Sequence, residues 1–508
     1  MSSKDLFKFK SPQTRTLHLT WIAFFISFFA WFNMAPLAGT MVDSVGWLTM
    51  DHIAALAIIN VALTIPARIV IGMLLDKYGP RRVFSILLIV MAIPTFMFAF
   101  GTTWMQLFIS RLLLSSIGAS FVVGIRMVSE WFPPKSVGFA EGFYAGWGNF
   151  GSAAAAIVLP WLAITMFGGD EGWRYAIAFS GIACIIYGVI YWFVVSDTPE
   201  GKVYTKPRKT AAMEVSSYGD MVQLIIWTVP LVGALGLLSW RLKNLEFISE
   251  QALNIIYVVL VVVLIYQIVQ ILRVNLPILK AGVPEDDKYK FKNVAALNTT
   301  YFANFGAELA IVSMLPLFFL TTFGLTATAA GLIASSFAFV NLFARPFGGW
   351  LSDKMSSRKT VMLMYMFGIG LGLAGMGMIN SEWPLILAVA VTVLTSMFIQ
   401  GAEGATFAVI PLIKKRITGQ ISGMAGAYGN VGAVVYLTIF TLVTPQTFFF
   451  ILAGGAFFSF LFCLLFLDEP KGSHGEEYEL SSVDIAQQEK ELQAQVATSI
   501  NKQQIKGA

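Results

Sequence analysis

Charged side chains are scarce in this chain. They make up 12% of its 508 residues, about half the share of an ordinary soluble domain, while hydrophobic residues make up 57%. Its two cysteines, Cys184 and Cys463, lie inside apolar runs, which favours packing roles over a disulfide. The three histidines, His18, His52 and His474, are too scattered for a metal site. The sequence contains no Ser/His/Asp grouping and no G-x-x-x-x-G-K-[ST] loop, so we expect neither an enzyme nor an ATPase, and no cofactor.

Long apolar runs fill the sequence instead. The mean hydropathy is +0.72, and many runs have the roughly 18–28 residues that a helix needs to cross a membrane. The chain is therefore predicted to be an all-α polytopic protein of the lipid bilayer. Fourteen spans are expected, at residues 18–38, 52–75, 83–101, 106–128, 138–165, 173–195, 222–240, 253–272, 296–321, 327–351, 360–379, 384–411, 418–442 and 446–467.

Lysine and arginine set the predicted orientation. With both termini in the cytoplasm, the inner segments hold 27 of the 34 Lys and Arg residues, and the outer loops hold only Arg174, Arg241 and Lys243. Cytoplasmic segments of membrane proteins are enriched in these residues. We therefore expect cytoplasmic termini. The expected location is the cell membrane of a bacterium, and a eukaryotic membrane is the alternative that the residues leave open. The net charge of +5 is spread over short loops, so it does not indicate nucleic acid as a partner.

An internal repeat divides the chain. ARIVIGMLLDK begins at Ala67, and ARPFGGWLSDK begins 277 residues later at Ala344, each at the end of the second span of a set of six. Two further runs lie between the sets and are interpreted as an inserted hairpin; the alternative is that one of them lies on the membrane surface. The expected units are an N-terminal segment (1–17), a six-helix bundle (18–195), a linker with the hairpin (196–295), a second six-helix bundle (296–467) and a polar tail (468–508).

Each copy of the repeat carries an arginine deep in the membrane. Arg68 and Arg345 precede their Asp-Lys pairs by two helical turns, or ~12 Å. A charge buried there costs roughly 3 kcal/mol. An anion clamped between the two arginines would compensate this cost. The structural alternative is an ion pair between each arginine and an intramembrane carboxylate.

The segment that follows the first arginine, GMLLDKYGPRR from Gly72 to Arg82, resembles the signature of the major facilitator superfamily. The second copy, which starts at Gly349, is a looser version. The resemblance implies two pseudo-symmetric six-helix bundles that rock about a central site, giving alternating access. It also implies a set of gating residues on the cytoplasmic side: Gly72, Asp76, Lys77, Arg81, Arg82, Gly349, Asp353 and Lys354.

A second repeat narrows the resemblance. GFYAGWGNFG starts at Gly142, and GMAGAYGNVG starts at Gly423. Packing between small residues explains the glycines but not an asparagine at the same place in both copies. The pair resembles the nitrate signature of the nitrate/nitrite porter family. It implies a substrate site that includes Gly148, Asn149, Gly429 and Asn430, with the asparagines donating to the anion or fixing the glycine-rich backbone.

The same resemblance implies roles for three aromatic residues. Tyr301 and Phe305 are four residues apart, so they share a helical face, and they match a Tyr-x-x-x-Phe-Gly run that this family places at the anion. Phe121, twelve residues before Pro133, matches a ring that the family places against the substrate. Packing is the alternative for all three. Two further segments, GAEGATFAVI from Gly401 and GAEL from Gly306, look closer to the assimilatory nitrate transporters of plants, algae and cyanobacteria than to the respiratory exchangers of bacteria.

The expected function is secondary transport of nitrate, and also of nitrite, into the cell. An anion entering a negative interior needs a driving ion or a counter-anion. We expect proton symport, with Glu308, Glu403 or Glu141 as the proton carrier. Glu308 has an alternative role as the structural partner of Arg126 or Arg111.

Other functions remain open at this point. Nitrate/nitrite exchange is the runner-up and needs no carboxylate. A transporter-derived sensor would be expected to carry a signalling domain in its tail, and none is recognisable there. A carrier of organic anions would share the arginines but would not be expected to share the asparagine repeat. We expect a monomer with a mostly disordered tail after residue 468, in which 481–500 could form a helix and a regulatory partner could bind.

Overall fold

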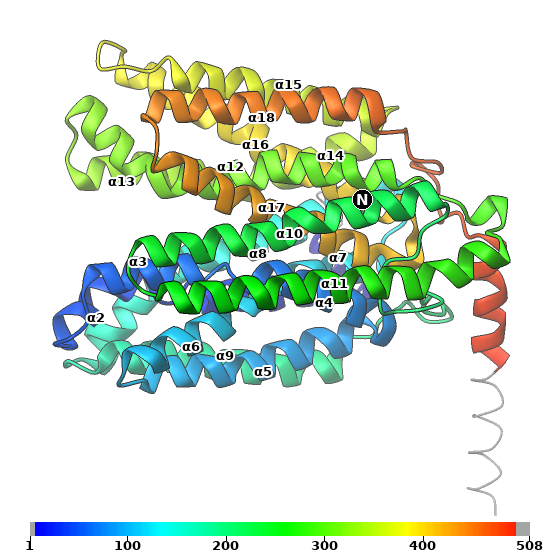
Figure 1. Cartoon of the computed structure of the whole chain (residues 1–508), viewed down its shortest axis with the longest axis horizontal. Helices are drawn as coiled ribbons and strands as arrows, with labels where there is room; N and C mark the ends of the chain where they lie inside the picture. Colours follow the sequence, from blue (N-terminus) through cyan, green and yellow to red (C-terminus); the bar gives the residue numbers. More distant parts are fainter. Residues whose placement is uncertain (1–5, 494–508) are drawn as a thin grey trace, which may run out of the picture.

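The structure, a computed structural model, describes residues 6–493. Within these residues it contains helices but no strand, and fourteen helical segments are long and apolar enough to cross a membrane. The spans run side by side along the long axis of the molecule (Figure 1). The all-α, fourteen-span prediction is therefore confirmed.

Nine helices build the first six spans, because three of these spans are broken. They are α1 (Pro12–Trp31), α2 (Ala38–Ser44), α3 (Met50–Ile59), α4 (Thr64–Tyr78), α5 (Pro80–Phe100), α6 (Trp104–Leu114), α7 (Ser120–Trp131), α8 (Pro134–Trp161) and α9 (Gly172–Val194).

The last six spans comprise α12 (Phe291–Phe323), α13 (Ala327–Phe339), α14 (Asn341–Lys354), α15 (Arg358–Gly377), α16 (Leu385–Ile413), α17 (Thr418–Phe440) and α18 (Pro445–Phe466). The inserted hairpin consists of α10 (Tyr218–Asn244) and α11 (Glu250–Ala281). Helix α10 packs on α17 and α12, while α11 is largely exposed. Both lie parallel to the other spans (Figure 1), which argues against the alternative in which one lies on the membrane surface.

The second span of each half is broken just before its arginine. The chain turns at residues 60–63 between α3 and α4, and at Val340 between α13 and α14. As a result, Arg68 and Arg345 are each the fifth residue of a helix that begins inside the membrane. The start of a helix carries unpaired N–H groups and the positive end of the helix dipole. Both arginines therefore lie close to a helix end that favours anions.

Glycines let the two halves touch. A Cβ atom at Gly349 of α14 would lie 1.9 Å from the carbonyl oxygen of Gly138 on α8, and one at Gly72 of α4 would lie 2.4 Å from that of Gly419 on α17. Each arginine helix thus packs backbone to backbone on the glycine-rich helix of the opposite half. We call these two contacts, α8–α14 and α4–α17, the seam.

The tail differs from its prediction. Residues 468–493 are not disordered, because they make hydrogen bonds and ion pairs with the rest of the protein, and residues 482–493 form a helix. The remainder of the predicted 481–500 helix lies outside the described residues. The tail helix, red in Figure 1, lies at one end of the bundle, which we call the tail side.

The close contact at the seam gives a first prediction. Gly349→Ala should destabilise the protein by about 1–3 kcal/mol, because the added methyl group overpacks the α8–α14 contact. The melting temperature of the purified protein measures this. Gly331→Ala on α13 is the control, since a Cβ there meets nothing within 4 Å. Equal melting temperatures for the two variants would contradict the backbone contact.

Candidate functional site

The two repeated arginines meet at the interface between the halves. Arg68 and Arg345 are each only 1% exposed. Their guanidinium carbons lie 5.3 and 5.6 Å from the centroid of the same ring, that of Phe121 on α7. The structure thus brings both arginines to the same ring, and the anion that is predicted to lie between them remains a prediction.

Aromatic rings form one wall of this site. The Tyr301 ring lies parallel to Phe121 and to Phe305, with centroid distances of 6.1 and 4.9 Å. Phe407 of α16 packs edge-on against Phe121 and Tyr301. We did not predict Phe407. Its spacing of four residues from Glu403, which places both on one helical face, was the signal that could have identified it.

The two guanidinium groups have different partners. Arg68 donates from Nε to the carbonyl oxygen of Gly118 (3.3 Å) and from Nη1 to that of Gly426. Among the described residues, no carboxylate forms an ion pair with it. Arg345 forms an ion pair with Glu403 and donates from Nη2 to the Tyr301 hydroxyl (3.2 Å). Its Nε and Nη1 atoms are buried without a hydrogen-bond partner.

The structural alternative for the arginines therefore applies to only one of them. Arg345 does have an intramembrane carboxylate, whereas Arg68 is surrounded by carbonyl oxygens and ring faces. Arg345 nevertheless keeps two unused N–H donors. These donors are available to a ligand that can reach the site.

Glu308 lies near the ion pair between Arg345 and Glu403. Its Oε1 accepts a hydrogen bond from Asn341 Nδ2 at 3.0 Å, and its carboxyl group interacts electrostatically with Glu403 and Arg345. The alternative pairing with Arg126 or Arg111 is wrong.

Those two arginines are engaged elsewhere. Arg126 forms ion pairs with Asp76 and Glu130, and Arg111 donates to the side chain of Asn33.

Glu141 lies away from the arginine site. Its carboxylate is buried without a hydrogen-bond partner, and the charges that act on it are Asp353, Lys415 and Arg358, all near the tail side. It is thus placed at the seam.

The second copy of the glycine-asparagine repeat lies against Arg68 and the aromatic wall. A Cβ at Gly429 would lie 2.5 Å from the Tyr301 ring, so this glycine makes room for the aromatic wall. Asn430 Nδ2 donates to the carbonyl oxygen of Gly426, which also accepts from Arg68. Asn430 therefore fixes the backbone beside the arginine.

The first copy contacts both halves. A Cβ at its Gly142 would lie 2.4 Å from the carbonyl oxygen of Arg345 on α14, whereas its Gly148-Asn149 end faces its own half. Gly148 makes room for the Phe24 ring of α1. Asn149 is half-buried, and no contact between its side chain and either arginine occurs among the described residues.

The two aspartates of the predicted gating set tie the halves together. Asp76 of α4 accepts hydrogen bonds from the backbone N–H groups of Gly419 (2.9 Å) and Gln420 (2.8 Å). Asp353 of α14 accepts from those of Gly138 (2.9 Å) and Phe139 (2.7 Å). Each carboxylate thus binds the first turns of a helix in the opposite half, where the helix dipole favours a negative charge.

The gating cations do not cross the seam. Lys77, Arg82 and Lys354 are exposed. The backbone N–H of Arg81 donates to Asp197 Oδ1 within the first half, at 2.7 Å. The halves are therefore joined by the glycines and aspartates of the signature.

Comparison with known proteins supports the resemblance. The family model described as Major Facilitator Superfamily matches residues 20–284 and 297–500. Nitrate/nitrite transporter NrtP of Nostoc punctiforme is 48% identical over 483 residues, covering 94% of this chain and 96% of the relative. NrtP of a Picosynechococcus species is 45% identical, covering 92% and 95%. High-affinity nitrate transporter 2.3 of Oryza sativa is 28% identical, covering 86% and 73%.

Solved structures share the fold at low sequence identity. The proton:xylose symporter XylE bound to 6-bromo-6-deoxy-D-glucose has a TM-score of 0.59 at 16% identity, covering 91% of this chain and 98% of its own. FucP in the outward conformation has a TM-score of 0.61 at 11% identity, covering 89% and 99%. The chain therefore belongs to the major facilitator superfamily and, within it, to the same family as the cyanobacterial nitrate/nitrite transporters.

Proposed function

We propose that this membrane transporter imports nitrate, and also nitrite, with the anion held between Arg68 and Arg345. The observation that carries this proposal is the pair of buried guanidinium groups, one from each half, beside a shared ring. The names of the cyanobacterial relatives point to the same substrates.

The chemistry of the site suits a small planar anion. Arginine is always charged and presents a planar fork of N–H donors that matches paired oxygens. The stacked rings of Phe121, Tyr301 and Phe305 provide one flat wall. A planar nitrate or nitrite would lie flat against such a wall, which suits it better than a larger tetrahedral anion. Bound nitrate would also relieve the repulsion between the two guanidinium groups.

Alternating access would use the seam. The halves are joined by backbone contacts at Gly72 and Gly349 and by hydrogen bonds to Asp76 and Asp353. Release on this side requires the four contacts to break. The excess of Lys and Arg assigns the tail side to the cytoplasm, so opening the seam would deliver the anion into the cell.

We infer proton symport from the ion pair between Arg345 and Glu403. Nitrate competes with the Glu403 carboxylate for the same guanidinium group. A proton that neutralises Glu403 frees Arg345, so proton and anion bind together and the charge of the site is unchanged. Glu308, on α12, interacts electrostatically with Glu403, so it is the second candidate for the proton. The protonation of Glu403 would depend on its charged and polar neighbours Arg345, Glu308 and Tyr301.

The arginines give the first functional test. In proteoliposomes with an inward proton gradient and no internal anion, Arg68→Lys and Arg345→Lys should each lose about 10-fold or more in apparent nitrate affinity, because lysine cannot replace a charge-assisted fork. Nitrate uptake at a series of concentrations measures this. Arg273→Lys in the inserted hairpin, at an exposed position, is the matched control.

Two outcomes would change the proposal. Normal affinity in both lysine variants would rule out the clamp. Uptake by the parent protein only when nitrate or nitrite is loaded inside would make the protein an exchanger.

The carboxylate gives the second functional test. One pH unit across the membrane corresponds to about 1.4 kcal/mol, so one proton per nitrate supports about tenfold accumulation. Glu403→Gln should abolish this accumulation while retaining nitrate counterflow, because glutamine resembles the protonated acid. Glu382→Gln, at an exposed loop position, is the control. Gradient-driven accumulation by Glu403→Gln would exclude this residue as the coupling group.

A further inference from the structure

The tail crosses the seam on the tail side. From the first half, Lys135 forms an ion pair with Glu476, and its backbone N–H donates to the Gly475 carbonyl at 3.3 Å. From the second half, Arg358 Nη2 donates to the Ser473 carbonyl at 3.0 Å. Arg358 also donates to the carbonyl of Pro134, at the start of α8. The tail therefore lies where the two halves meet.

Tyr478 extends from the tail into this junction. Lys415 Nζ, in the loop before α17, lies 4.1 Å from the centroid of its ring. The Tyr478 hydroxyl is buried. Burial raises the pKa of the phenol well above its usual range, and the Glu141 carboxylate of α8 contributes to the shift. The side chain thus has charged neighbours from both halves.

Two anchors hold the tail to the second half. The Glu469 carboxylate accepts hydrogen bonds from the backbone N–H groups of Arg358 and Lys359, each at 2.9 Å, at the start of α15. Asp484 Oδ1 accepts from Arg416 Nη1, also at 2.9 Å.

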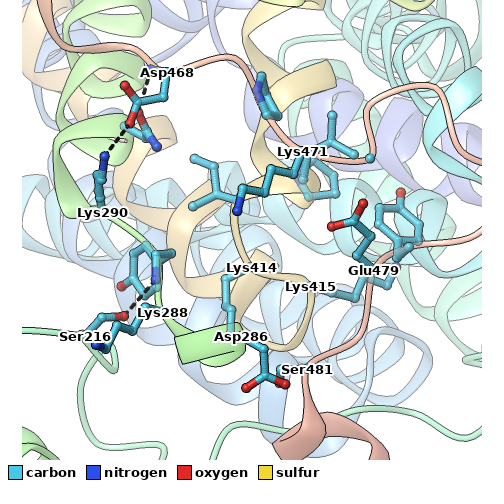
Figure 2. A pocket seen from close by; sticks show the side chains of 18 of the residues that line it. Ser216, Asp286, Lys288, Lys290, Lys414, Lys415, Asp468, Lys471, Glu479 and Ser481 are labelled. Carbon is cyan, nitrogen blue, oxygen red and sulfur yellow. Dashed lines mark hydrogen bonds and ion pairs between the residues drawn. The ribbon is translucent and has the colours of Figure 1, made fainter. Parts of the chain in front are cut away.

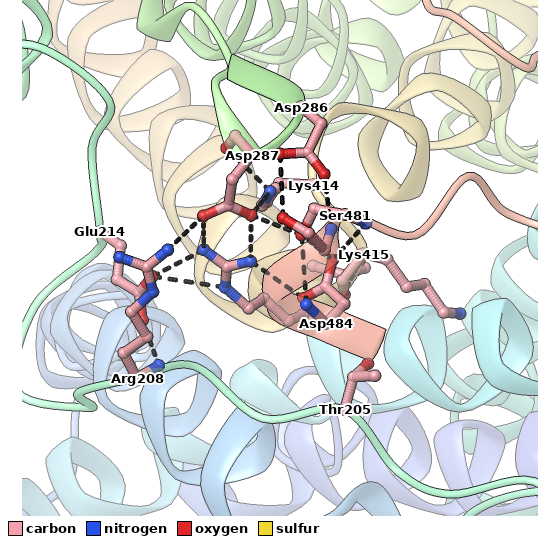
Figure 3. Close-up of polar contacts among 12 residues, drawn as sticks. Thr205, Arg208, Glu214, Asp286, Asp287, Lys414, Lys415, Ser481 and Asp484 are labelled. Carbon is pink, nitrogen blue, oxygen red and sulfur yellow. Dashed lines mark hydrogen bonds and ion pairs between the residues drawn. The ribbon is translucent and has the colours of Figure 1, made fainter. Parts of the chain in front are cut away.

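The second anchor is a buried ion cluster that the linker shares. Arg416 also pairs with Glu214 and Asp287, and the Ser481 hydroxyl donates to Asp287 (Figure 3). Removing one partner from such a cluster leaves an uncompensated buried charge, which is costly. This cluster therefore fixes the tail beside the first turn of α17, which binds Asp76.

The tail lies over open space between its anchors. A cavity of about 720 Å³ separates the tail from residues 285–290 and from the loop before α17. Figure 2 shows Lys471 reaching from the tail over this cavity, with Lys288 and Lys290 on the opposite rim. The middle of the tail can therefore move without displacing the core of either half.

We propose that residues 469–484 are a latch that holds the tail side of the transporter closed. The proposal rests on the alternating access proposed above. Both anchors lie on the second half, while Gly475 and Glu476 contact Lys135 of the first half, so parting of the halves must detach the middle of the latch. The ion pair between Lys135 and Glu476 is exposed to solvent: the exposed fraction is 45% for the Lys135 side chain and 76% for the Glu476 side chain. Exposed ion pairs are weak, so the latch biases the closed state without locking it.

Hydrogen–deuterium exchange of the full chain in nanodiscs tests the latch. Glu476→Lys should speed amide exchange about two- to fivefold, the range expected for an exposed ion pair, in peptides covering residues 134–142 and 349–356. Tyr478→Ala should speed exchange in the same peptides, because it removes the ring that lies against Lys415. These peptides lie on either side of the seam. The same variants should raise the maximal rate of nitrate uptake, because the seam opens in every transport cycle.

Matched variants separate the latch from a general loss of stability. Tyr478→Phe keeps the ring and should behave like the parent. Glu489→Lys makes the same charge change at an exposed tail position and should leave exchange unchanged. Adding Lys135→Glu to Glu476→Lys restores the ion pair with reversed charges and should restore slow exchange.

The exchange measurement tests the latch separately from the proposed nitrate transport. Parent-like exchange in both Tyr478→Ala and Glu476→Lys would overturn the latch, whatever their uptake. Faster exchange at the seam supports the latch even if the parent protein fails to transport nitrate, because this measurement does not involve the substrate.

Discussion

Two permanent positive charges buried at one interface are the constraint on which this structure depends. Arg68 and Arg345 cannot be neutralised by losing a proton, so the fold must compensate them where they lie. It does so with carbonyl oxygens and ring faces around Arg68 and with one carboxylate at Arg345. Both arginines also sit near helix starts, which add positive potential. A site assembled in this way keeps two buried N–H donors of Arg345 without partners, and a small anion would satisfy them.

The seam follows from the same repeat. Each half contributes an arginine helix and a glycine-rich helix, and each arginine helix packs on the glycine-rich helix of the other half. The aspartates then bind helix starts across the interface at hydrogen-bond distances of 2.7–2.9 Å. An aspartate in this position loses its partners only when the halves part. Closure of the tail side and the geometry of the arginine site are therefore set by the same four helices.

Much of this arrangement could be predicted from the sequence, because it depends on span length, spacing and repetition. The fourteen spans are confirmed, and the two arginines of the repeat lie beside the same ring. The expectation that Tyr301 and Phe121 belong to this site came from the family resemblance rather than from spacing or repetition. What the sequence did not reveal depends on three-dimensional neighbours. The pairing of Glu403 with Arg345, the edge-on Phe407 and the ordered tail each join segments far apart in the chain. The tail is too polar to form a core, but it is held by charged partners that composition alone does not locate.

The two halves have diverged around their arginines. Phe24 and Tyr301 hold corresponding positions in the first span of each half, 277 residues apart, and their rings lie 5.6 and 6.1 Å from Phe121. Only Tyr301 carries a hydroxyl, and that hydroxyl accepts from Arg345. The carboxylates Glu403 and Glu308 also lie on this side. Arg68 thus provides a constant charge, whereas the availability of Arg345 depends on groups that can change protonation. An anion bound across both would be coupled to protons through one half alone.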